Sequence, residues 1–256
     1  MDGEIPAENP ERSTAVPDLT GASYLGLLKT LHQFLQPETY LEIGTAEGSS
    51  FALAQCASIA VDPVIRVGAN AIGKKPACHL FQMTSDRFFR RHDPSRILGQ
   101  PIDFAFLDGL HYWEVLLRDF INTERHCRRQ SVIALHDCVP TNVYVAERRN
   151  DFERRKAFVS HPDDWAGDVW KVLPVLRRFR PDLTIYAVDA PPTGLVMITG
   201  LDPTSTVLAD SYFAIFNEFR DITLLDYGID RHFAEIKLLP TGDFQSLCDV
   251  MARFSW

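Results

Sequence analysis

The stretch Tyr40-Leu-Glu-Ile-Gly-Thr-Ala-Glu-Gly-Ser-Ser50 predicts a short buried strand, a glycine turn and the start of a helix. Gly44 and Gly48 stand where the strand must turn, and without a Cβ atom their backbone allows a ligand to approach closely. Asp62 ends the next apolar run, where a carboxylate can accept hydrogen bonds from ribose hydroxyls. These features together predict a nucleotide-type binding unit.

The charge of this turn narrows the class of ligand. Glu42 and Glu47 flank the glycines, so they would repel a pyrophosphate but tolerate a cationic ligand such as S-adenosylmethionine (SAM). The spacing also lacks the third glycine of the dinucleotide fingerprint, which disfavours NAD. A sulfonium cofactor is therefore the leading interpretation.

Composition excludes several other classes of protein. The 256 residues are 46% hydrophobic, enough for a substantial core, and the formal net charge of −8 argues against nucleic acid as the main partner. The acidic start does not resemble a signal peptide, and we see no apolar run of membrane-spanning length. Five widely spaced cysteines without a CxxC pair are typical of free thiols. We therefore expect a cytoplasmic protein that associates with no membrane.

Apolar runs alternate with helical patterns along the chain. The predicted strands are residues 40–43, 58–61, 79–82, 102–107, 132–135, 183–188 and 193–199, the last two forming a hairpin. Predicted helices cover residues 19–35, 111–129 and 169–178. Short apolar strands separated by helices indicate an α/β fold, with a mostly parallel seven-stranded sheet covered by helices on both faces.

The same pattern divides the chain into segments. Residues 1–18 are expected to form a disordered arm, and residues 19–199 the cofactor-binding domain. Within that domain, the polar segment 138–168 has no apolar period and is interpreted as a lid or substrate insertion. Residues 200–256 form a C-terminal helical extension, with helices near 212–219 and 244–254, that covers a sheet edge or joins a homodimer.

Two aspartates mark a candidate reaction site. Asp108 ends the fourth predicted strand and Asp137 follows the fifth, so both lie at the carboxyl edge of the sheet, where open α/β folds bind ligands. Paired carboxylates suit a hard cation such as Mg²⁺, which would lower the pKa of a bound hydroxyl. His111 follows Asp108 by three residues and is a candidate general base.

Several of these residues resemble the motifs of a known family. The segment from Glu42 to Gly48, taken with Asp62, resembles the first two motifs of class I SAM-dependent methyltransferases. The resemblance continues through Asp108-Gly-Leu-His-Tyr-Trp-Glu114, Leu135-His-Asp137 and Gly167-Asp-Val-Trp-Lys171, and covers roughly residues 20–199. These later motifs are similar to a bacterial branch of small-molecule O-methyltransferases. The resemblance implies a Rossmann-like fold and methyl transfer to a hydroxyl of a natural product or a sugar.

The resemblance also implies residue roles. Glu42 would face the methionine amino group of the cofactor, Asp62 the ribose and Ser85 the adenine. The implied cofactor-binding set is Glu42, Gly44, Thr45, Gly48, Asp62, Ser85 and Asp108. The candidate catalytic residues are His111, Asp108 and His136, and the candidate ligands for Mg²⁺ or Mn²⁺ are Asp108, His136 and Asp137.

One position departs from the family pattern. Related metal-dependent enzymes carry an acidic pair at the end of the fifth strand, whereas this chain has His136 and Asp137. His136 thus has three open roles: binding a softer metal such as Mn²⁺, acting as the base, or orienting Asp137. Two alternative functions also stay open, a non-catalytic SAM-binding scaffold and a nucleotide-dependent oxidoreductase.

Overall fold

The computed structural model describes residues 19–254, and the predicted arm, residues 1–18, lies outside them. The strands form one sheet in the order β3-β2-β1-β4-β5-β7-β6-β8. Their bounds are β1 (Thr39–Ile43), β2 (Ala57–Asp62), β3 (Cys78–Gln82), β4 (Ile102–Leu107), β5 (Cys127–His136), β6 (Thr184–Asp189), β7 (Leu195–Thr199) and β8 (Leu239–Pro240). Only β7 runs antiparallel to its neighbours in this sheet, which confirms the mostly parallel α/β prediction.

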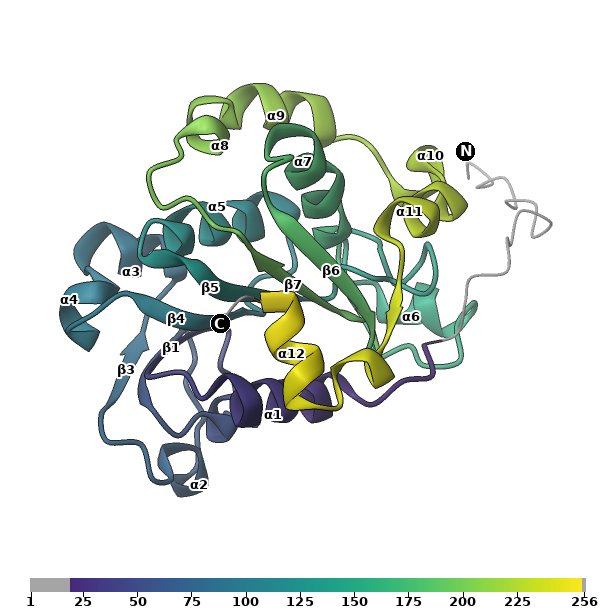
Figure 1. Ribbon diagram of the computed structural model, residues 1–256. Coiled ribbons are helices and arrows are strands. Elements are labelled where there is room, and N and C mark those ends of the chain that lie inside the picture. Colours follow the sequence, from purple (N-terminus) through teal and green to yellow (C-terminus); the bar gives the residue numbers. More distant parts are fainter. Residues whose placement is uncertain (1–18, 255–256) are drawn as a thin grey trace, which may run out of the picture.

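Helices cover both faces of the sheet (Figure 1). Their bounds are α1 (Tyr24–Leu35), α2 (Ala69–Ile72), α3 (Ser85–Arg91), α4 (Pro94–Leu98), α5 (Trp113–Glu124), α6 (Phe152–Lys156), α7 (Val172–Phe179), α8 (Val207–Asp210), α9 (Tyr212–Phe219), α10 (Leu224–Tyr227), α11 (Ile229–Ile236) and α12 (Leu247–Phe254). Short 3-10 helices cover Phe51–Leu53, Val169–Lys171 and Thr241–Phe244.

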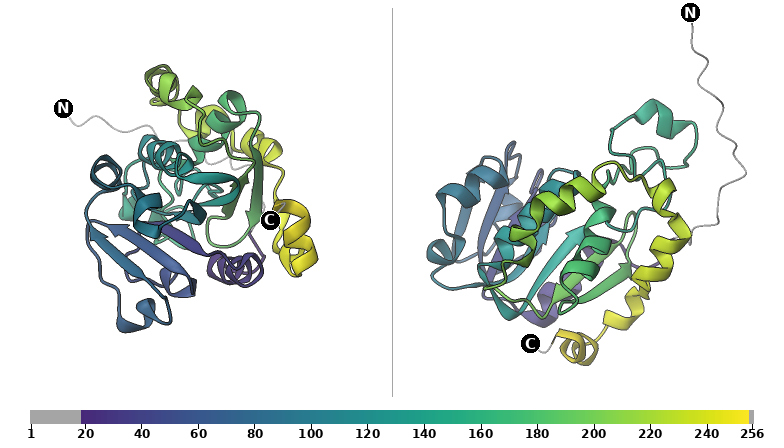
Figure 2. Two further views of the ribbon diagram at one scale, coloured as in Figure 1. Left: turned by 60° about the vertical axis from the view of Figure 1, so that its left-hand side comes forward. Right: turned by 90° about the horizontal axis from the view of Figure 1, so that it is seen from above.

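Alternation along the strands divides the core into two layers. Leu41 and Ile43 of β1 face a cluster with α5, α7 and α9, whereas Tyr40 packs on the opposite side with α1 and α12. Figures 1 and 2 show the same arrangement, with α5 and α7 on one face and α1 and α12 on the other. The predicted apolar face of α5 is buried, and each large side chain on it contributes about 1.5–3 kcal/mol.

Three predicted boundaries need correction. The sheet has eight strands rather than seven, because the extension returns to pair β8 with β6. The helix expected after the glycine turn is only the 3-10 turn Phe51–Leu53, because β2 begins soon afterwards. The helix expected over 111–129 ends at Glu124, since β5 already begins at Cys127.

Two other predicted segments agree with the structure. β6 and β7 form the predicted antiparallel hairpin, and α9 covers the predicted residues 212–219. All five cysteines are free, as expected. Among residues 19–254, no helix is long and apolar enough to cross a membrane.

Candidate active site

Strand register brings the predicted site residues to one edge of the sheet. Ile43 of β1 pairs with Leu107 of β4, and Leu107 pairs with Leu135 of β5. The residues that follow these three therefore emerge side by side, at the point where the strand order reverses from β1 to β4. The carboxyl ends of β1, β4 and β5 thus form one site.

Gly44 packs the glycine turn against Asp108 of the candidate reaction site. Its φ is +86°, and a Cβ atom there would lie 1.9 Å from the carbonyl oxygen of Asp108. Gly48 has φ +83°, and a Cβ atom there would press on Val67 and Ala71. Both glycines thus serve the close packing of the turn against neighbouring segments of the protein, in addition to any role with a ligand.

Glu42 is a fully buried acid near the end of β1. Its carboxylate accepts hydrogen bonds from the Tyr40 hydroxyl at 2.6 Å and the Ser50 hydroxyl at 3.0 Å. Burial raises the pKa of Glu42 to about 8, although the two hydroxyl donors work against that rise. The side chain is therefore largely protonated at pH 7, and a cationic partner would favour its ionised form.

Asp62 lies against the glycine turn, as the nucleotide-type interpretation requires. Its carboxylate accepts the backbone N–H of Ala46 at 2.9 Å and that of Val64 at 2.7 Å. Thr45, between Gly44 and Ala46, is 3% exposed, and its hydroxyl is a donor that acts to lower the pKa of Glu42. The Asp62 carboxylate thus lies beside the turn that carries Thr45. Ser85, the predicted adenine contact, is the buried first residue of α3.

Two aspartates and two histidines form the centre of the site. His111 Nε2 lies 3.1 Å from Asp137 Oδ2 and 3.5 Å from Asp108 Oδ1. His136 Nδ1 lies 3.3 Å from Asp137 Oδ2 and 3.4 Å from Asp108 Oδ1. Each carboxylate is therefore flanked by both imidazoles. Asp137 also has φ +61°, an uncommon conformation for a residue other than glycine and one often found at functional sites.

The pKa values follow from this pairing. Burial alone would lower the pKa of His111, but Asp137 and Asp108 raise it to about 9. The pKa of His136 is likewise raised despite burial, because of the same two carboxylates. Burial acts to raise the pKa of Asp108, but His136 and His111 outweigh it and lower that pKa. Without another cation at the site, the two carboxylates therefore favour the charged form of both imidazoles.

The donor atoms also define a candidate cation site. Ligand atoms of Asp108, His111 and Asp137 all lie within 4.8 Å of one another. His111, predicted as the base, thus joins the group of donors, while His136 contacts the same two carboxylates from the Tyr24 side. A small pocket opens between these groups. Its lining is Leu107, Asp108, Gly109, Leu110, His111, Leu116, His136, Asp137 and Val169.

Sequence reasoning missed two residues of the site. The ring of Tyr24, at the start of α1, lies 4.1 Å from the His136 ring, and burial followed by Asp108 and Asp137 raises its pKa to about 12. Thr193, just before β7, donates its hydroxyl to the carboxylate of Asp137. The Ser23 hydroxyl caps α1, but no pattern in the sequence indicated that Tyr24 would lie beside His136.

Comparison with known families found one model that matches part of this chain. A family model described as a methyltransferase domain matches residues 41–138, which include the glycine turn, Asp62, Asp108 and Asp137 but less than half of the chain. This match confirms the resemblance that the sequence motifs indicated over those residues. The mostly parallel sheet is Rossmann-like, and residues 41–138 are similar to a methyltransferase domain.

Several solved structures are similar to this chain at low sequence identity. The O-methyltransferase from Bacillus cereus in complex with SAH has 15% identity and a TM-score of 0.49, over 72% of this chain and 83% of that one. The O-methyltransferase TomG from Streptomyces achromogenes, involved in tomaymycin synthesis and in complex with SAM, has 18% identity and a TM-score of 0.47, over 72% and 82%. Cofactor-bound Rv0187 from MTB has 15% identity and a TM-score of 0.48, over 72% and 83%. The comparison with curated protein sequences found no match.

Proposed function

We propose that the protein is a SAM-dependent O-methyltransferase that acts on a hydroxyl of a small molecule, such as a natural product or a sugar. The observation that carries the proposal is the placement of Asp108, His111 and Asp137 at the same sheet edge as the glycine turn, within residues that match a methyltransferase domain. A methyl donor and an oxygen activated by these groups would thus meet at one edge.

The turn suits a cationic cofactor better than a pyrophosphate. Glu42 and Asp62 are acids beside it, and Arg66 is already paired with Glu47 at 3.2 Å. In this arrangement Asp62 would accept the ribose hydroxyls, and Glu42 would face the ammonium group. When bound, SAM supplies an electrophilic methyl group on a sulfonium ion.

The residues of the reaction centre would prepare the acceptor oxygen. His111 Nδ1 lies 2.8 Å from the carbonyl oxygen of Trp165, which can only accept, so Nδ1 carries a proton and Nε2 is the position that exchanges one. Nε2 faces Asp108 and Asp137, and from there it would take the proton of the acceptor hydroxyl. Methyl transfer to that oxygen then leaves the proton on the imidazole.

The donor set also fits a divalent cation. Two carboxylates within 4.8 Å of one another suit Mg²⁺ or Mn²⁺, and we propose Asp108 and Asp137 as its ligands, with His111 Nε2 left free to accept the proton. Such a cation would supply the positive charge that lowers the pKa of a hydroxyl. It would also offset the two carboxylates that keep His111 protonated. His136 contacts both carboxylates and would orient them.

Calorimetry with SAM, SAH and NAD, each with and without Mg²⁺, separates this proposal from its alternatives. We expect SAM and SAH to bind in the micromolar range, NAD to give no heat, and Mg²⁺ to increase methyl transfer across a panel of hydroxyl acceptors. NAD binding would favour the oxidoreductase, and SAM binding without turnover on any acceptor would favour the scaffold. If a folded sample bound neither adenosyl ligand, the proposal would be wrong.

Asp62→Ala connects that binding to the proposed site. Loss of the carboxylate would remove charge-assisted hydrogen bonds to the ribose, so SAH affinity should fall about tenfold or more. Glu47→Gln is the matched control, because Glu47 flanks the same turn but is exposed and paired with Arg66. An equal effect of both variants would contradict the ribose assignment.

A pH dependence should follow from Glu42. Because burial raises its pKa to about 8, and a cationic ligand requires the ionised form, SAH affinity should rise as the pH increases from 7 to 9. The expected gain is about tenfold, most of it below pH 8. The control is Glu42→Gln, measured by calorimetry in parallel. Its SAH affinity should still vary with pH through titration of the ligand, but without the contribution of Glu42. Identical pH profiles for the two proteins would contradict this role.

A further inference from the structure

The end of the 138–168 insertion contacts the residues around His111 at three successive points. The Trp165 carbonyl accepts the imidazole Nδ1–H at 2.8 Å, and the Trp165 ring lies 5.1 Å from the imidazole. Gly167 packs against the backbone of His111 so closely that a Cβ atom would lie 2.0 Å from its carbonyl oxygen. Asp168 then accepts the backbone N–H of Trp113 at 3.1 Å.

The contact of Asp168 with Trp113 stabilises the start of α5. Tyr112, at the N-cap position of α5, makes no side-chain hydrogen bond to the first turn. The carboxylate of Asp168 takes that role from a distant part of the chain, and it is only 2% exposed. A carboxylate at a helix N-terminus is stabilised by the free N–H groups and the helix dipole there. The residue that it fixes is two positions from His111.

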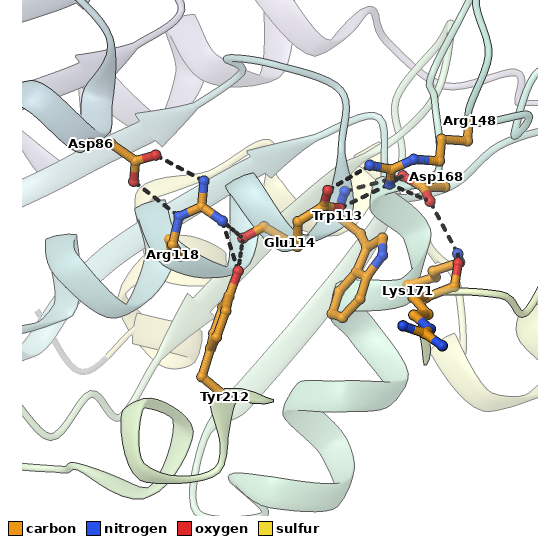
Figure 3. A network of polar contacts seen from close by, with 9 residues as sticks. Asp86, Trp113, Glu114, Arg118, Arg148, Asp168, Lys171 and Tyr212 are labelled. Atoms are coloured by element: carbon orange, nitrogen blue, oxygen red, sulfur yellow. Dashed lines mark hydrogen bonds and ion pairs between the residues drawn. The ribbon is translucent and has the colours of Figure 1, made fainter. Parts of the chain in front are cut away.

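Two cations hold Asp168 in place, as Figure 3 shows. Buried Lys171 Nζ lies 3.0 Å from Asp168 Oδ2 and also donates to the Arg220 carbonyl at 3.2 Å. Arg148 Nη1 lies 3.1 Å from the same oxygen, while its guanidinium pairs with Glu114 of α5 at 2.5 and 2.9 Å. The insertion, α5 and the C-terminal extension are therefore joined at one carboxylate.

We propose that Asp168 is a positioning residue for His111. By capping α5 and anchoring Trp165 to Asp168 against residues 111–113, it keeps the imidazole on the Trp165 carbonyl with Nε2 directed at Asp108 and Asp137. The insertion thus positions a residue of the reaction centre, in addition to any role as a lid. That this positioning assists catalysis rests on the proposed function. That Asp168 fixes the position of the His111 imidazole does not depend on it.

The test is NMR of the His111 Nδ1–H proton, assigned by its loss in His111→Gln. In the native protein the hydrogen bond to Trp165 should slow exchange of this proton with water. Asp168→Ala should accelerate that exchange at least tenfold, whereas Asp163→Ala, an exposed acid in the same insertion, should change it less than twofold. Asp168→Asn retains an oxygen that can accept the Trp113 N–H but loses the charge that pairs with Arg148 and Lys171, so it should accelerate exchange only about threefold. Unchanged exchange in folded Asp168→Ala would overturn the proposal.

A second variant covers the case in which Asp168→Ala fails to fold. Arg148 is 45% exposed, so Arg148→Gln should leave the fold intact while it removes the bridge between Glu114 and Asp168. It should accelerate exchange of the same proton about threefold, and no change would overturn the proposal. SAH calorimetry on the same samples separates the two claims. If the exchange rates change as expected but SAH does not bind, the proposed function is wrong and the positioning role of Asp168 stands.

Discussion

His111→Ala is expected to lower kcat for methyl transfer at least a hundredfold, because it removes the group that accepts the acceptor's proton. General bases contribute about 10²–10⁴-fold to the rates of the reactions they assist. Asp137→Ala should have a similar effect, since Asp137 Oδ2 lies 3.1 Å from His111 Nε2. Rates are measured at saturating SAM with the best acceptor of the panel, and SAH affinity by calorimetry should stay within about threefold.

The control for this prediction is a second histidine and aspartate pair. His126 Nδ1 lies 3.4 Å from Asp93 Oδ1, at the other end of β5 from the site. His126→Ala should therefore retain most of the native kcat. If His111→Ala kept more than a tenth of the native kcat, another group would have to serve as the base, and His136 would be the first to examine.

Gly44→Ala is expected to destabilise the protein by about 3 kcal/mol or more, and to abolish SAH binding. The left-handed backbone alone costs an alanine about 1–2 kcal/mol. The added Cβ would also lie 1.9 Å from the Asp108 carbonyl, and that oxygen cannot turn away because it belongs to the backbone. Overpacking adds about 1–3 kcal/mol and would displace Asp108. Urea unfolding gives the free energy of unfolding directly.

Gly99→Ala is the matched control for Gly44→Ala. Gly99 has φ +77°, but a Cβ atom there would have no heavy atom within 4 Å. It should therefore cost only the backbone preference, about 1–2 kcal/mol, and leave SAH binding unchanged. Equal losses of stability in the two variants would show that the contact with Asp108 is unimportant.

Much of the fold could be predicted from the sequence because it depends on local patterns. Apolar runs such as 102–107 and 132–135 are long enough and apolar enough to identify central strands, and both are buried in the sheet. The glycine turn with Asp62 was recognisable because φ above zero favours glycine and because strand ends carry ligand-binding acids. β8 was missed, since a two-residue strand carries no periodic signal.

The helix after the glycine turn shows the limit of such patterns. The sequence from Gly48 begins like a helix, but the chain has to return to the sheet at Ala57 and forms only a 3-10 turn. Similarly, residues 125–129 continue the charged pattern of α5, yet Cys127 already begins β5. In both places, pairing of the next strand in the sheet outweighs the local preference for helix.

From the sequence alone we could predict the fold class, the glycine turn and the edge residues Asp108, His111 and Asp137, because strand ends in a parallel sheet meet at one edge. The groups that surround these residues became apparent only in the folded protein. Tyr24 and Asp168 come from distant segments, and their distances from the site depend on how those segments pack. The protonation of Glu42 was likewise decided by burial, which depends on the whole fold and on no single stretch of sequence.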